Sequence, residues 1–498
     1  MKMTLKSKLA VIATITALLF SSCSKAEPDY SNEINGVEHH DIVIIGGGIA
    51  GLSCGHYLGN RDFLILEKRN SVGGRAISGV RNNFSYAKGA EYLGDPENRL
   101  SKMIKNIGLE PKEIPSPMDA YFDGKTFYYG SNGIERYLIN GSSVDEYKRF
   151  VNLLIKENEK YDEVPEIKYT NETKELDNTT AKSWLQRNNF KNIYIDKYNV
   201  TSRGLFGASL DNISALSFIP EAAFDYDKDD LNNISNDFDI ENEYQDALKE
   251  ESGSYTFTKG LTQLTERLAE TMSQKLRLSS NVVEVKKEGK YYIVVYKDKN
   301  DSTKIVMANK VVLAVPAPLA LKLAPTLISQ EKKDLIAQIK FASYATVAMF
   351  SKTPIFDKAF DLAVPDDYFF TDIYDATWVE KYYEKKVPET YIISAYIAPH
   401  SSDDHSLDKM SDAELMRKVY ADLDRIFPGA SKKITGYDIE HFPYGYPVMT
   451  LGAYERLLKL DKINYGTLLL AGDSMIYPTF ESAVESGYLA AERLIDTE

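Results

Sequence analysis

The sequence predicts an α/β fold in which one mostly parallel sheet is assembled from separate parts of the chain, with a second α+β region inserted between them. Two stretches support this prediction. Residues 41–51 run from a short apolar segment into a glycine-rich turn, the pattern of a buried strand followed by a helix. Residues 466–473 have the pattern of another buried strand, and residues 480–487 open a second helix. Both ends of the chain therefore carry the pattern of a buried strand followed by a helix.

The glycine-rich turn has the spacing G-x-G-x-x-G, formed by Gly46, Gly48 and Gly51, with Ile49 and Ala50 at the start of the helix. One glycine makes the tight turn, one lets a phosphate approach the backbone, and one lets the helix pack closely on the strand. A pyrophosphate then binds the free N–H groups at the helix N-terminus. The pattern predicts a nucleotide-binding turn.

A second apolar run, Phe63 to Leu66, ends at Glu67, 21 residues after Gly46. In a dinucleotide-binding βαβ unit, a carboxylate at this spacing accepts hydrogen bonds from the adenosine ribose hydroxyls. Tight glycine turns occur in many βαβ units, so the carboxylate makes the signal more specific. Together the two features predict a dinucleotide-binding domain.

The residues that follow indicate which dinucleotide cofactor binds. Lys68 stands next to the carboxylate, while Gly73, Gly74 and Arg75 offer a second close backbone approach and a cation for phosphate. Strand-Glu-Lys-x-x-x-x-Gly-Gly-Arg resembles the FAD-binding start of the flavin-containing amine oxidase superfamily, which includes monoamine oxidases, protoporphyrinogen oxidase and phytoene desaturases. The resemblance implies FAD as cofactor. It also implies a Rossmann-like FAD-binding domain of the discontinuous GR2 type, with an inserted α+β substrate-binding domain.

The same resemblance implies how the chain is divided. The FAD-binding domain is expected from residues 40–115, 253–330 and 456–498. The substrate-binding domain is expected from residues 116–252 and 331–455. Amphipathic helix patterns prevail in the first of these substrate-domain segments, and strand patterns are frequent in the second.

Further FAD contacts are implied by the resemblance: a turn near the flavin ring, a strand that meets adenine through its backbone, and a closing strand and helix around the ribityl chain and isoalloxazine. They are Gly89, Ala90, Glu91 and Tyr92 in the turn, Val282 or Val283 in the strand, Gly472 and Asp473 after the closing strand, and Ser482, Ala483 and Val484 in the helix. Ala90 replaces a family glycine, and Asp473 replaces a residue that is more often glutamate. A helix N-terminus beside the flavin pyrimidine stabilises negative charge on the reduced ring.

The substrate side departs from the family pattern. Amine oxidases carry a lysine in the strand after an Ala-x-Pro turn, and the matching position here is Thr346, which has no titratable amine. One position of the family's aromatic cage falls on Gly445, between Tyr444 and Tyr446, and the other falls on Thr479. An offset of one residue restores an aromatic side chain at each place. The candidate catalytic residues are therefore Thr346, Tyr444, Tyr446 and Thr479.

Composition argues against other classes of protein. The 498-residue chain has a formal net charge of −14, whereas a nucleic-acid partner requires a basic face. Its two cysteines, Cys23 and Cys54, and its six histidines show no metal-binding spacing, so redox chemistry must come from an organic cofactor. No cysteine lies near Tyr444, which excludes a cysteinyl–flavin bond and favours noncovalent FAD. A histidyl bond stays open.

Residues 1–23 have the pattern of a targeting segment: lysines first, then a mostly apolar stretch from Leu9 to Phe20, then small residues and Cys23. The stretch is short for a membrane span. It resembles a bacterial lipoprotein signal peptide, in which the cysteine is lipidated and becomes the mature N-terminus, with residues 24–39 as a linker. The expected location is the bacterial cell envelope, on the periplasmic face or the cell surface, anchored by the lipid on Cys23. Simple secretion, an uncleaved anchor and a cytoplasmic protein are the alternatives.

These features predict an FAD-dependent oxidoreductase that moves hydride from a C–N or C–C bond of a small or hydrophobic substrate to flavin N5. Orientation of the substrate and exclusion of water would be the protein's contribution. Two alternatives stay open, a desaturase-like or protoporphyrinogen-oxidase-like enzyme and a non-catalytic surface flavoprotein. The electron acceptor, O₂ or another, does not follow from the sequence.

Overall fold

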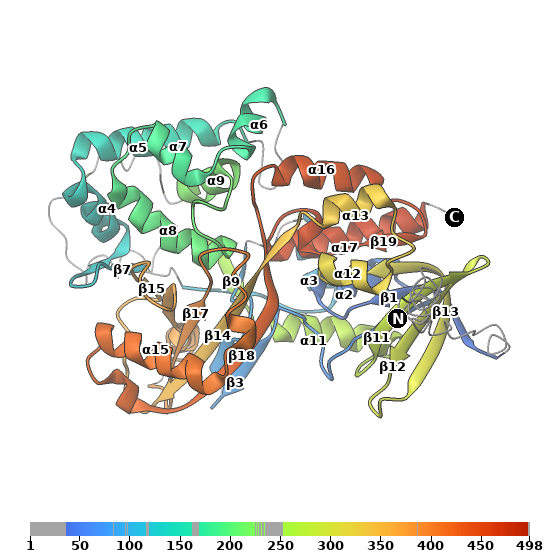
Figure 1. The fold of residues 1–498 in the computed structure, drawn as a ribbon. Coiled ribbons are helices and arrows are strands. Elements are labelled where there is room, and N and C mark those ends of the chain that lie inside the picture. The colour runs from blue at the N-terminus through green and yellow to red at the C-terminus, as the bar shows by residue number, and fades with distance from the viewer. Residues whose placement is uncertain are drawn as a thin grey trace, which may run out of the picture. The chain divides into compact units, whose positions relative to one another are not determined.

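Two seven-stranded sheets form the frame of the protein in its computed structural model (Figure 1). The structure describes residues 36–496, apart from residues 83, 95, 97, 116–118, 162–168 and 386; between residues 225 and 251 it describes only 226, 228, 231 and 234. The chain divides into the units Met1–His39 and His40–Glu498, and the second unit holds the fold. The predicted signal peptide and most of the predicted linker lie outside the described residues.

The first sheet has the strand order β10–β2–β1–β13–β12–β11, with β19 beside β13. Strands β1, β2 and β10 run parallel, as do β13 and β19, whereas β11, β12 and β13 are antiparallel neighbours. Their bounds are β1 Glu38–Ile45, β2 Phe63–Leu66, β10 Leu276–Arg277, β11 Asn281–Glu288, β12 Tyr291–Lys297, β13 Thr303–Leu313 and β19 Leu468–Leu470. The α/β sheet assembled from distant segments, which the sequence predicts, is confirmed.

Strand β1 is buried on both of its faces. Ile42 and Ile44 pack in one apolar cluster, and Val43 and Ile45 pack in another on the opposite face. The first cluster includes residues of α2 Ile49–Leu58, α3 Asn98–Asn106, α11 Thr262–Thr271 and α17 Phe480–Ile495, and the second includes residues of α12 Ala317–Leu323 and α13 Gln330–Ile336. Cover on both faces explains why these strands are uninterrupted apolar runs.

The second sheet has the order β18–β14–β17–β16–β15–β7–β8, antiparallel except where β15 meets β7. Its strands are β7 Ala120–Phe122, β8 Phe127–Tyr129, β14 Lys340–Ser351, β15 Asp361–Ala363, β16 Asp372–Asp375, β17 Tyr391–Ile397 and β18 Ile434–Val448. Side chains alternate between the two faces of a sheet. Ala345, Val347 and Met349 share an apolar cluster with α15, Asp412–Ile426. The intervening residues of β14 therefore face the other way.

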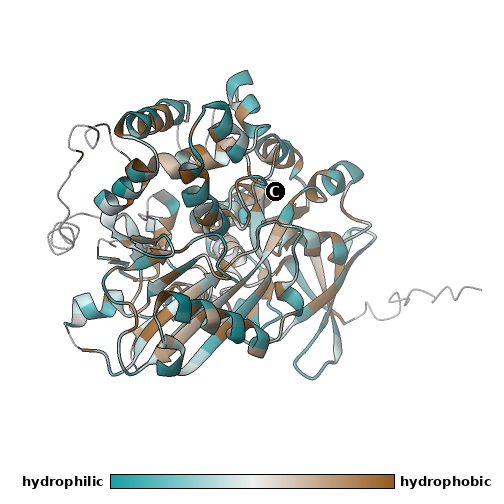
Figure 2. Ribbon diagram, turned by 60° about the vertical axis from the view of Figure 1, so that its left-hand side comes forward, coloured by the Kyte–Doolittle hydropathy of each residue, from teal (hydrophilic) through white to brown (hydrophobic). Residues whose placement is uncertain are grey.

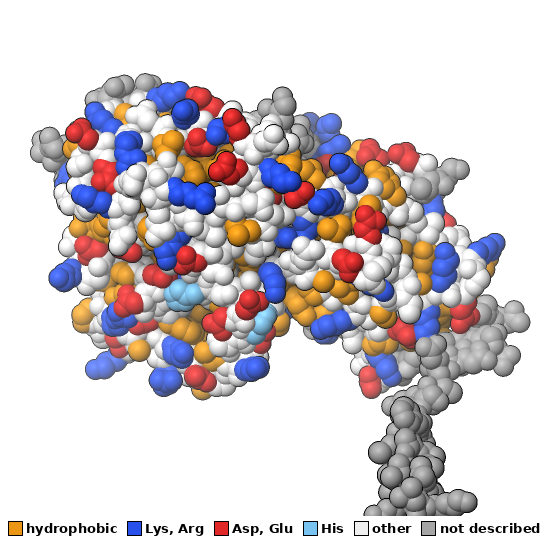
Figure 3. All heavy atoms as spheres, turned by 45° about the horizontal axis from the view of Figure 1, so that its top comes forward, with side chains coloured by type: hydrophobic (Ala, Val, Ile, Leu, Met, Phe, Trp, Pro, Cys, Tyr) orange, Lys and Arg blue, Asp and Glu red, His pale blue; other side chains and the backbone are white. Residues whose placement is uncertain are grey.

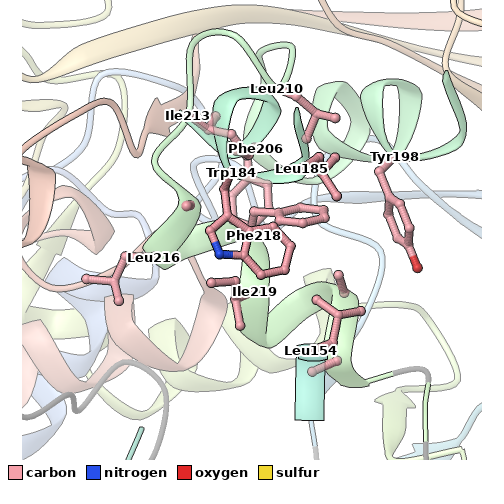
Figure 4. Packing of buried hydrophobic residues seen from close by; sticks show 14 of the residues in the cluster. Leu154, Trp184, Leu185, Tyr198, Phe206, Leu210, Ile213, Leu216, Phe218 and Ile219 are labelled. Carbon is pink, nitrogen blue, oxygen red and sulfur yellow. The ribbon is translucent and has the colours of Figure 1, made fainter. Parts of the chain in front are cut away.

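A helical layer completes the second region. Its helices are α4 Gly130–Gly141, α5 Val144–Asn158, α6 Asn171–Asp177, α7 Ala181–Arg187, α8 Asn192–Phe206 and α9 Ala215–Phe224. The side-chain oxygens of Ser143, Thr170 and Thr180 cap α5, α6 and α7 by accepting from backbone N–H groups. Figure 4 shows the apolar cluster between these helices, in which the rings of Trp184 and Phe218 lie 6.1 Å apart. The cluster also includes Ala342 of β14 and Val448 of β18, so it joins the helical layer to the second sheet.

Shorter elements connect the two sheets. Strands β3 Ser78–Arg81 and β4 Phe84–Ala87 pair with each other, and β5 Leu93–Gly94, β6 Lys112–Glu113 and β9 Ser254–Thr256 form a three-stranded sheet. The remaining helices are α14 Trp378–Glu384 and α16 Ala453–Ile463, with 3₁₀ turns η2 Ser273–Lys275, η3 Leu407–Lys409, η4 Ala430–Lys433 and η5 Asp473–Met475. Most of these elements border the candidate site or its supports.

Helix α13 shows where the chain crosses between the two regions. Ile336 of this helix shares an apolar cluster with Val43 and Ile45 of the first sheet. The predicted domain boundary between residues 330 and 331, which falls inside α13, stays a prediction. Figure 2 shows apolar colour along many of the strands, in keeping with their burial.

The drawn face of the molecule carries both signs of charge. Lys and Arg side chains are interspersed with Asp and Glu side chains across it (Figure 3). Within the described residues, no helix combines the length and the apolar character needed to cross a bilayer.

Candidate active site

The first glycine turn and Glu67 contact each other at the ends of β1 and β2. The Gly47 N–H donates to Glu67 Oε2 at 2.6 Å, and the Arg69 N–H donates to Oε1 at 2.7 Å. Gly46 has a φ of +111°, and a Cβ there would collide with the carbonyl oxygen of Ala314, so this turn requires glycine. The carboxylate is fixed beside the turn and keeps lone pairs for ribose hydroxyls. Lys68 next to it is exposed.

The second glycine turn lies on the first. The Gly73 N–H donates to the Gly47 carbonyl oxygen at 2.9 Å, and Gly48 and Gly73 form a parallel bridge. Among the described residues, a Cβ on Gly48 would meet only the Gly74 Cα, at 3.8 Å. The backbone at Gly48 is therefore open where the two turns meet, which is what a bound phosphate needs.

Helices α2 and α17 pack along each other near these turns. Helix α2 starts with Ile49, Ala50 and Gly51, and α17 has Ser482, Ala483 and Val484 in its first turns. The Ser53 hydroxyl donates to the Val484 carbonyl oxygen at 2.7 Å. Each helix N-terminus carries partial positive charge that favours an anion or a developing negative charge nearby.

Arg75 and Asp473 form an ion pair. Nη1 and Nη2 of Arg75 donate to the two carboxylate oxygens at 2.8 and 2.7 Å, and Nη1 also donates to the Gly445 carbonyl oxygen at 3.0 Å. Burial alone lowers the pKa of Arg75, but the attraction of Asp473 raises that pKa above its usual value. Asp473 follows Gly472, whose φ is +141°. The predicted phosphate cation and the predicted ribityl acceptor are thus partners.

Strand β11 begins beside Glu67, whose carbonyl oxygen accepts from the Ser280 N–H at 2.7 Å. Val282 is buried and pairs with Tyr296 across the hairpin. Val283 is the extra residue at a bulge in the β11–β12 ladder, and its side chain is exposed. A contact to adenine requires backbone groups that are not paired in the β-ladder, and of the two valines Val283 meets this requirement.

The turn from Lys88 to Tyr92 lies against Arg75. The Ala90 N–H donates to the Arg75 carbonyl oxygen at 2.8 Å, and a Cβ on Gly89 would collide with that oxygen. Tyr92 is 41% exposed, yet the protein packed around it raises the pKa of its hydroxyl well above the usual value. Both are true of a side chain that lines an internal hollow. We call the space beside the partly exposed Tyr92 the hollow.

A row of tyrosines forms one wall of this hollow. The ring centres of Tyr446 and Tyr344 are 6.4 Å apart, those of Tyr344 and Tyr396 are 5.9 Å apart, and those of Tyr396 and Tyr374 are 5.6 Å apart. Burial raises the pKa of all four hydroxyls above the usual value, so they are neutral near pH 7.

The wall is one face of the second sheet. Thr346, Tyr396 and Asp372 lie directly opposite one another on β14, β17 and β16, so they share that face. The Thr346 hydroxyl donates to the Lys88 carbonyl oxygen at 2.8 Å, and the Tyr396 hydroxyl donates to the Gly89 carbonyl oxygen at 3.2 Å. These bonds hold the turn against the sheet.

Three carboxyl groups are enclosed at the far part of this face. Burial raises the pKa of Glu91 well above its usual value, and Asp372 and Asp119 raise it further. Burial raises the pKa of Asp372 to about 7, although Arg203 lowers it. The pKa of Asp361 is raised by burial, then by Asp372, Asp119 and Glu91. Negative charge on one of these carboxylates therefore raises the pKa of its neighbours.

The four candidate catalytic residues have different surroundings. Tyr446 belongs to the wall of the hollow, and Thr346 is buried on the same sheet face with its hydroxyl bonded to the turn. Tyr444 packs edge-on against Phe341 in the core of the first sheet. Thr479 caps α17 by accepting from the Ser482 N–H at 3.1 Å. Tyr92, from the turn, is a further aromatic side chain at the hollow.

Sequence reasoning missed Tyr344, Tyr396, Asp361 and Asp372. A signal for them exists in the sequence, because polar or aromatic residues alternate with apolar ones in these strands, as in Tyr344-x-Thr346 and Asp372-x-Tyr374. Such alternation marks one polar face of a sheet. Nothing in the sequence places that face opposite the turn at residues 88–92, since the two are joined only by tertiary contacts.

Comparison with known proteins agrees with this arrangement. The family model "Flavin containing amine oxidoreductase" matches residues 49–495. Amine oxidase [flavin-containing] A of Canis lupus familiaris is 36% identical over 104 residues, which are 20% of this chain and 20% of that protein. The chain thus matches about a fifth of the length of this curated relative.

Solved structures show the same fold over nearly the whole chain. A triple mutant of putrescine oxidase has a TM-score of 0.70 at 17% identity, with 92% of this chain and 99% of that one covered. A putative protoporphyrinogen oxidase from Exiguobacterium sp. 255-15 has a TM-score of 0.66 at 17% identity, with 93% and 99% covered. At this identity the likeness is evidence for the fold alone.

The open glycine turns, with no side chain to block a phosphate, and the carboxylate of Glu67 beside them fit an adenine dinucleotide. The family match begins at the first of these turns and ends in α17, and the structure packs α17 against the helix that follows the turn. Because sequence match and structure agree over this whole span, the chain belongs to the flavin-containing amine oxidoreductase family, with FAD as its cofactor.

Proposed function

We propose that this protein oxidises the C–N bond of an aliphatic amine. The observation that carries the proposal is the hollow beside the turn at residues 88–92, walled by neutral tyrosines and closed by buried carboxyl groups. When bound, FAD supplies the acceptor for the hydride that leaves the substrate carbon. The names of relatives, amine oxidase and putrescine oxidase, support the same bond.

The lining suits an ammonium group better than a hydrocarbon. Aromatic faces such as those of Tyr344, Tyr396 and Tyr446 attract cations, more strongly where water is excluded. When ionised, the carboxyl groups at one end favour a cationic ligand and disfavour an apolar or anionic one. The tyrosine row therefore orients the substrate chain, and its enclosure keeps water from the reacting bond.

In this proposal Thr346 holds the turn at residues 88–92 in place and does not take part in the chemistry. The Thr346 hydroxyl is committed to the Lys88 carbonyl oxygen, and a hydroxyl cannot serve as a titratable base near neutral pH. The protein's contribution is then orientation and exclusion of water. A cysteinyl bond to FAD is not expected, since Cys54, the cysteine in the described part of the chain, is fully buried in α2, and this favours noncovalent FAD.

An oxidation of a C–C bond is the second candidate. The absence of a lysine at position 346 favours it, as does the likeness to a putative protoporphyrinogen oxidase.

An anaerobic test separates C–N oxidation from C–C oxidation. Purified full-length protein in detergent is mixed with aliphatic amines or with unsaturated and porphyrinogen substrates, and the flavin absorption band is followed. Bleaching by an amine supports the proposal. Bleaching only by a C–C substrate, or by none of them, contradicts it, and the second result favours a non-catalytic flavoprotein.

We further propose that the protein is anchored to a bacterial envelope membrane by lipid on Cys23. The pattern of residues 1–23 supports this, although it lies outside the described residues. Labelling with radioactive palmitate, followed by fractionation, tests it. Wild-type protein should carry the label and sediment with membranes, and C23A should do neither. Unlabelled wild-type protein in the membrane fraction would rule out lipid anchoring.

A further inference from the structure

We propose that Arg456 binds one small monovalent anion, of the size of chloride, in a cavity that also borders Asp473. The anion would balance the charge of the buried guanidinium and would stabilise the turn that carries Asp473. The inference depends neither on the substrate nor on the bond that is oxidised.

The cavity lies where helix α16 meets the end of β18 and the turn η5. Arg456 belongs to α16, Val448 to β18, and Asp473 and Ser474 to η5. Apart from Tyr477, the other residues that line the cavity are apolar. The space admits one group of about the size of a water molecule. A single small ion therefore fits, whereas phosphate is too large.

Arg456 is a buried cation, with 8% of its surface exposed. Its Nη2 donates to the Thr450 hydroxyl oxygen at 3.1 Å, while its Nε is shielded from solvent and meets no acceptor among the described residues. A guanidinium does not lose its proton in proteins, so the charge stays. Because a buried charge without a partner is strongly destabilising, a bound anion would stabilise the folded state.

Asp177 is the carboxylate that attracts Arg456, but it is committed to another task. Its Oδ1 accepts from the Tyr454 N–H at 3.4 Å, and its Oδ2 accepts from the Glu455 N–H at 3.2 Å and from the Tyr169 hydroxyl at 3.1 Å. Asp177 therefore serves the first turn of α16. Burial lowers the pKa of Arg456 by more than Asp177 raises it, and no ion pair joins the two within the described part of the chain.

Other enclosed arginines of this protein have a carboxylate of their own. Arg203, which is 2% exposed, pairs with Asp366 at 2.7 Å. Arg75 pairs with Asp473 at the same distance. Arg456 is thus the buried arginine for which the described residues supply no ion pair, so the balancing charge has to come from solution.

The remaining polar groups of the lining do not balance Arg456. Both oxygens of Asp473 accept from Arg75, and Oδ1 also accepts from the Ser474 N–H at 2.9 Å. The Arg75–Asp473 pair is neutral as a whole. The Tyr477 hydroxyl is neutral too, because burial raises its pKa well above the usual value. Arg456 therefore carries the uncompensated charge of the cavity.

An anion in this cavity would link α16 to η5. Asp473 is the first residue of η5, and it holds Arg75 of the second glycine turn. Loosening of η5 would therefore reach a turn that borders the FAD site. We expect the anion to slow the release of FAD.

The first test locates the anion. Crystals of the full-length holoenzyme are soaked in bromide, which resembles chloride in size and charge and is identified by its anomalous scattering. We expect an anomalous peak in the cavity at the Nε of Arg456, and none in R456M, which keeps an unbranched side chain without the charge. The absence of a bromide peak from the wild type overturns the inference, and so does a cavity that holds a water molecule only.

The second test measures the effect of the anion in solution. The rate of FAD release from the full-length holoenzyme is compared in chloride and in gluconate at equal ionic strength, so that screening is the same. We expect chloride to slow the release at least about threefold in the wild type and to have almost no effect in R456M.

R425M is the matched control. Arg425 pairs with Asp367 and Asp422 at 2.7 and 2.8 Å, so its removal should leave the wild-type response to chloride intact. No response in the wild type, or an equal response in R456M, overturns the inference. If R456M does not fold, the bromide result and the chloride response of the wild type decide.

Discussion

Arg75 and Asp473, which are 398 residues apart in the sequence, form a two-point ion pair with nitrogen–oxygen distances of 2.8 and 2.7 Å. The same guanidinium donates to the backbone of Gly445. One side chain therefore links the second glycine turn, the segment after β19 and the end of β18. These three segments border the FAD site and the hollow, so the pair couples cofactor binding to the folding of both sheets.

Replacing Arg75 should cost the protein its FAD. R75A leaves the mostly buried Asp473 without its cation, a change worth on the order of 3 kcal/mol in such settings. We expect the purified variant to contain less than a tenth of the wild-type flavin, measured from the ratio of visible to ultraviolet absorption. R69A is the matched control, because Arg69 pairs with Glu440 at 3.1 Å and does not contact Asp473. Full flavin content in R75A would show that the pair is not needed for FAD binding.

The cofactor side was predictable because its signals are local. Gly46, Glu67 and Arg75 stand at spacings set by one βαβ unit and its continuation, so each is read from its own stretch of sequence. The ion pair itself was not predictable. Arg75 and Asp473 each suggest a ligand contact when taken alone, and only the packing of distant segments makes them partners.

The substrate side was less predictable for a physical reason. Tyr444 and Tyr446 are two residues apart, which in a regular strand would place them on one face, but the irregularity in the β14–β18 pairing leaves Tyr446 in the tyrosine row and Tyr444 against Phe341. Asp361 becomes notable only when the sheet register places it near Asp372. Such positions depend on register, which a single sequence specifies weakly.

Gly89 should tolerate no side chain. A Cβ at this position would collide with the backbone carbonyl oxygen of Arg75, which cannot move without displacing the turn. We expect G89A to lose about 1–3 kcal/mol of stability and to slow flavin reduction by an amine at least 10-fold. In G436A the new methyl meets only Phe350 Cδ2, at 3.6 Å, so this control should keep the wild-type rate. Equal rates in the two variants would mean that the turn does not position the substrate.

Thr346 should matter for stability more than for catalysis. T346V keeps the shape of the side chain and removes the hydroxyl that bonds to the Lys88 carbonyl oxygen. We expect a loss of about 1 kcal/mol in the free energy of unfolding and a rate of flavin reduction within threefold of wild type. Chemical denaturation and stopped-flow absorption measure the two. A loss of 100-fold or more in rate, with FAD still bound, would instead make Thr346 a catalytic residue.

The carboxyl cluster should make stability fall as pH rises. Burial raises the pKa of Asp372 from 3.8 to about 7, against the opposing effects of Thr371 and Arg203. Between these two values the folded protein holds a proton that the unfolded chain releases, so the free energy of unfolding decreases across that window. Glu91 and Asp361 act in the same direction, because their pKa values are also raised.

D372N should therefore flatten the dependence of stability on pH and raise the melting temperature above pH 7, where the wild type must hold a buried charge. The gain should be at least about 1 kcal/mol at pH 8, measured by chemical denaturation of the holoenzyme. The neighbouring Asp119 and Arg203 stay unchanged in the variant, so a slope equal to that of wild type would show that Asp372 does not titrate there.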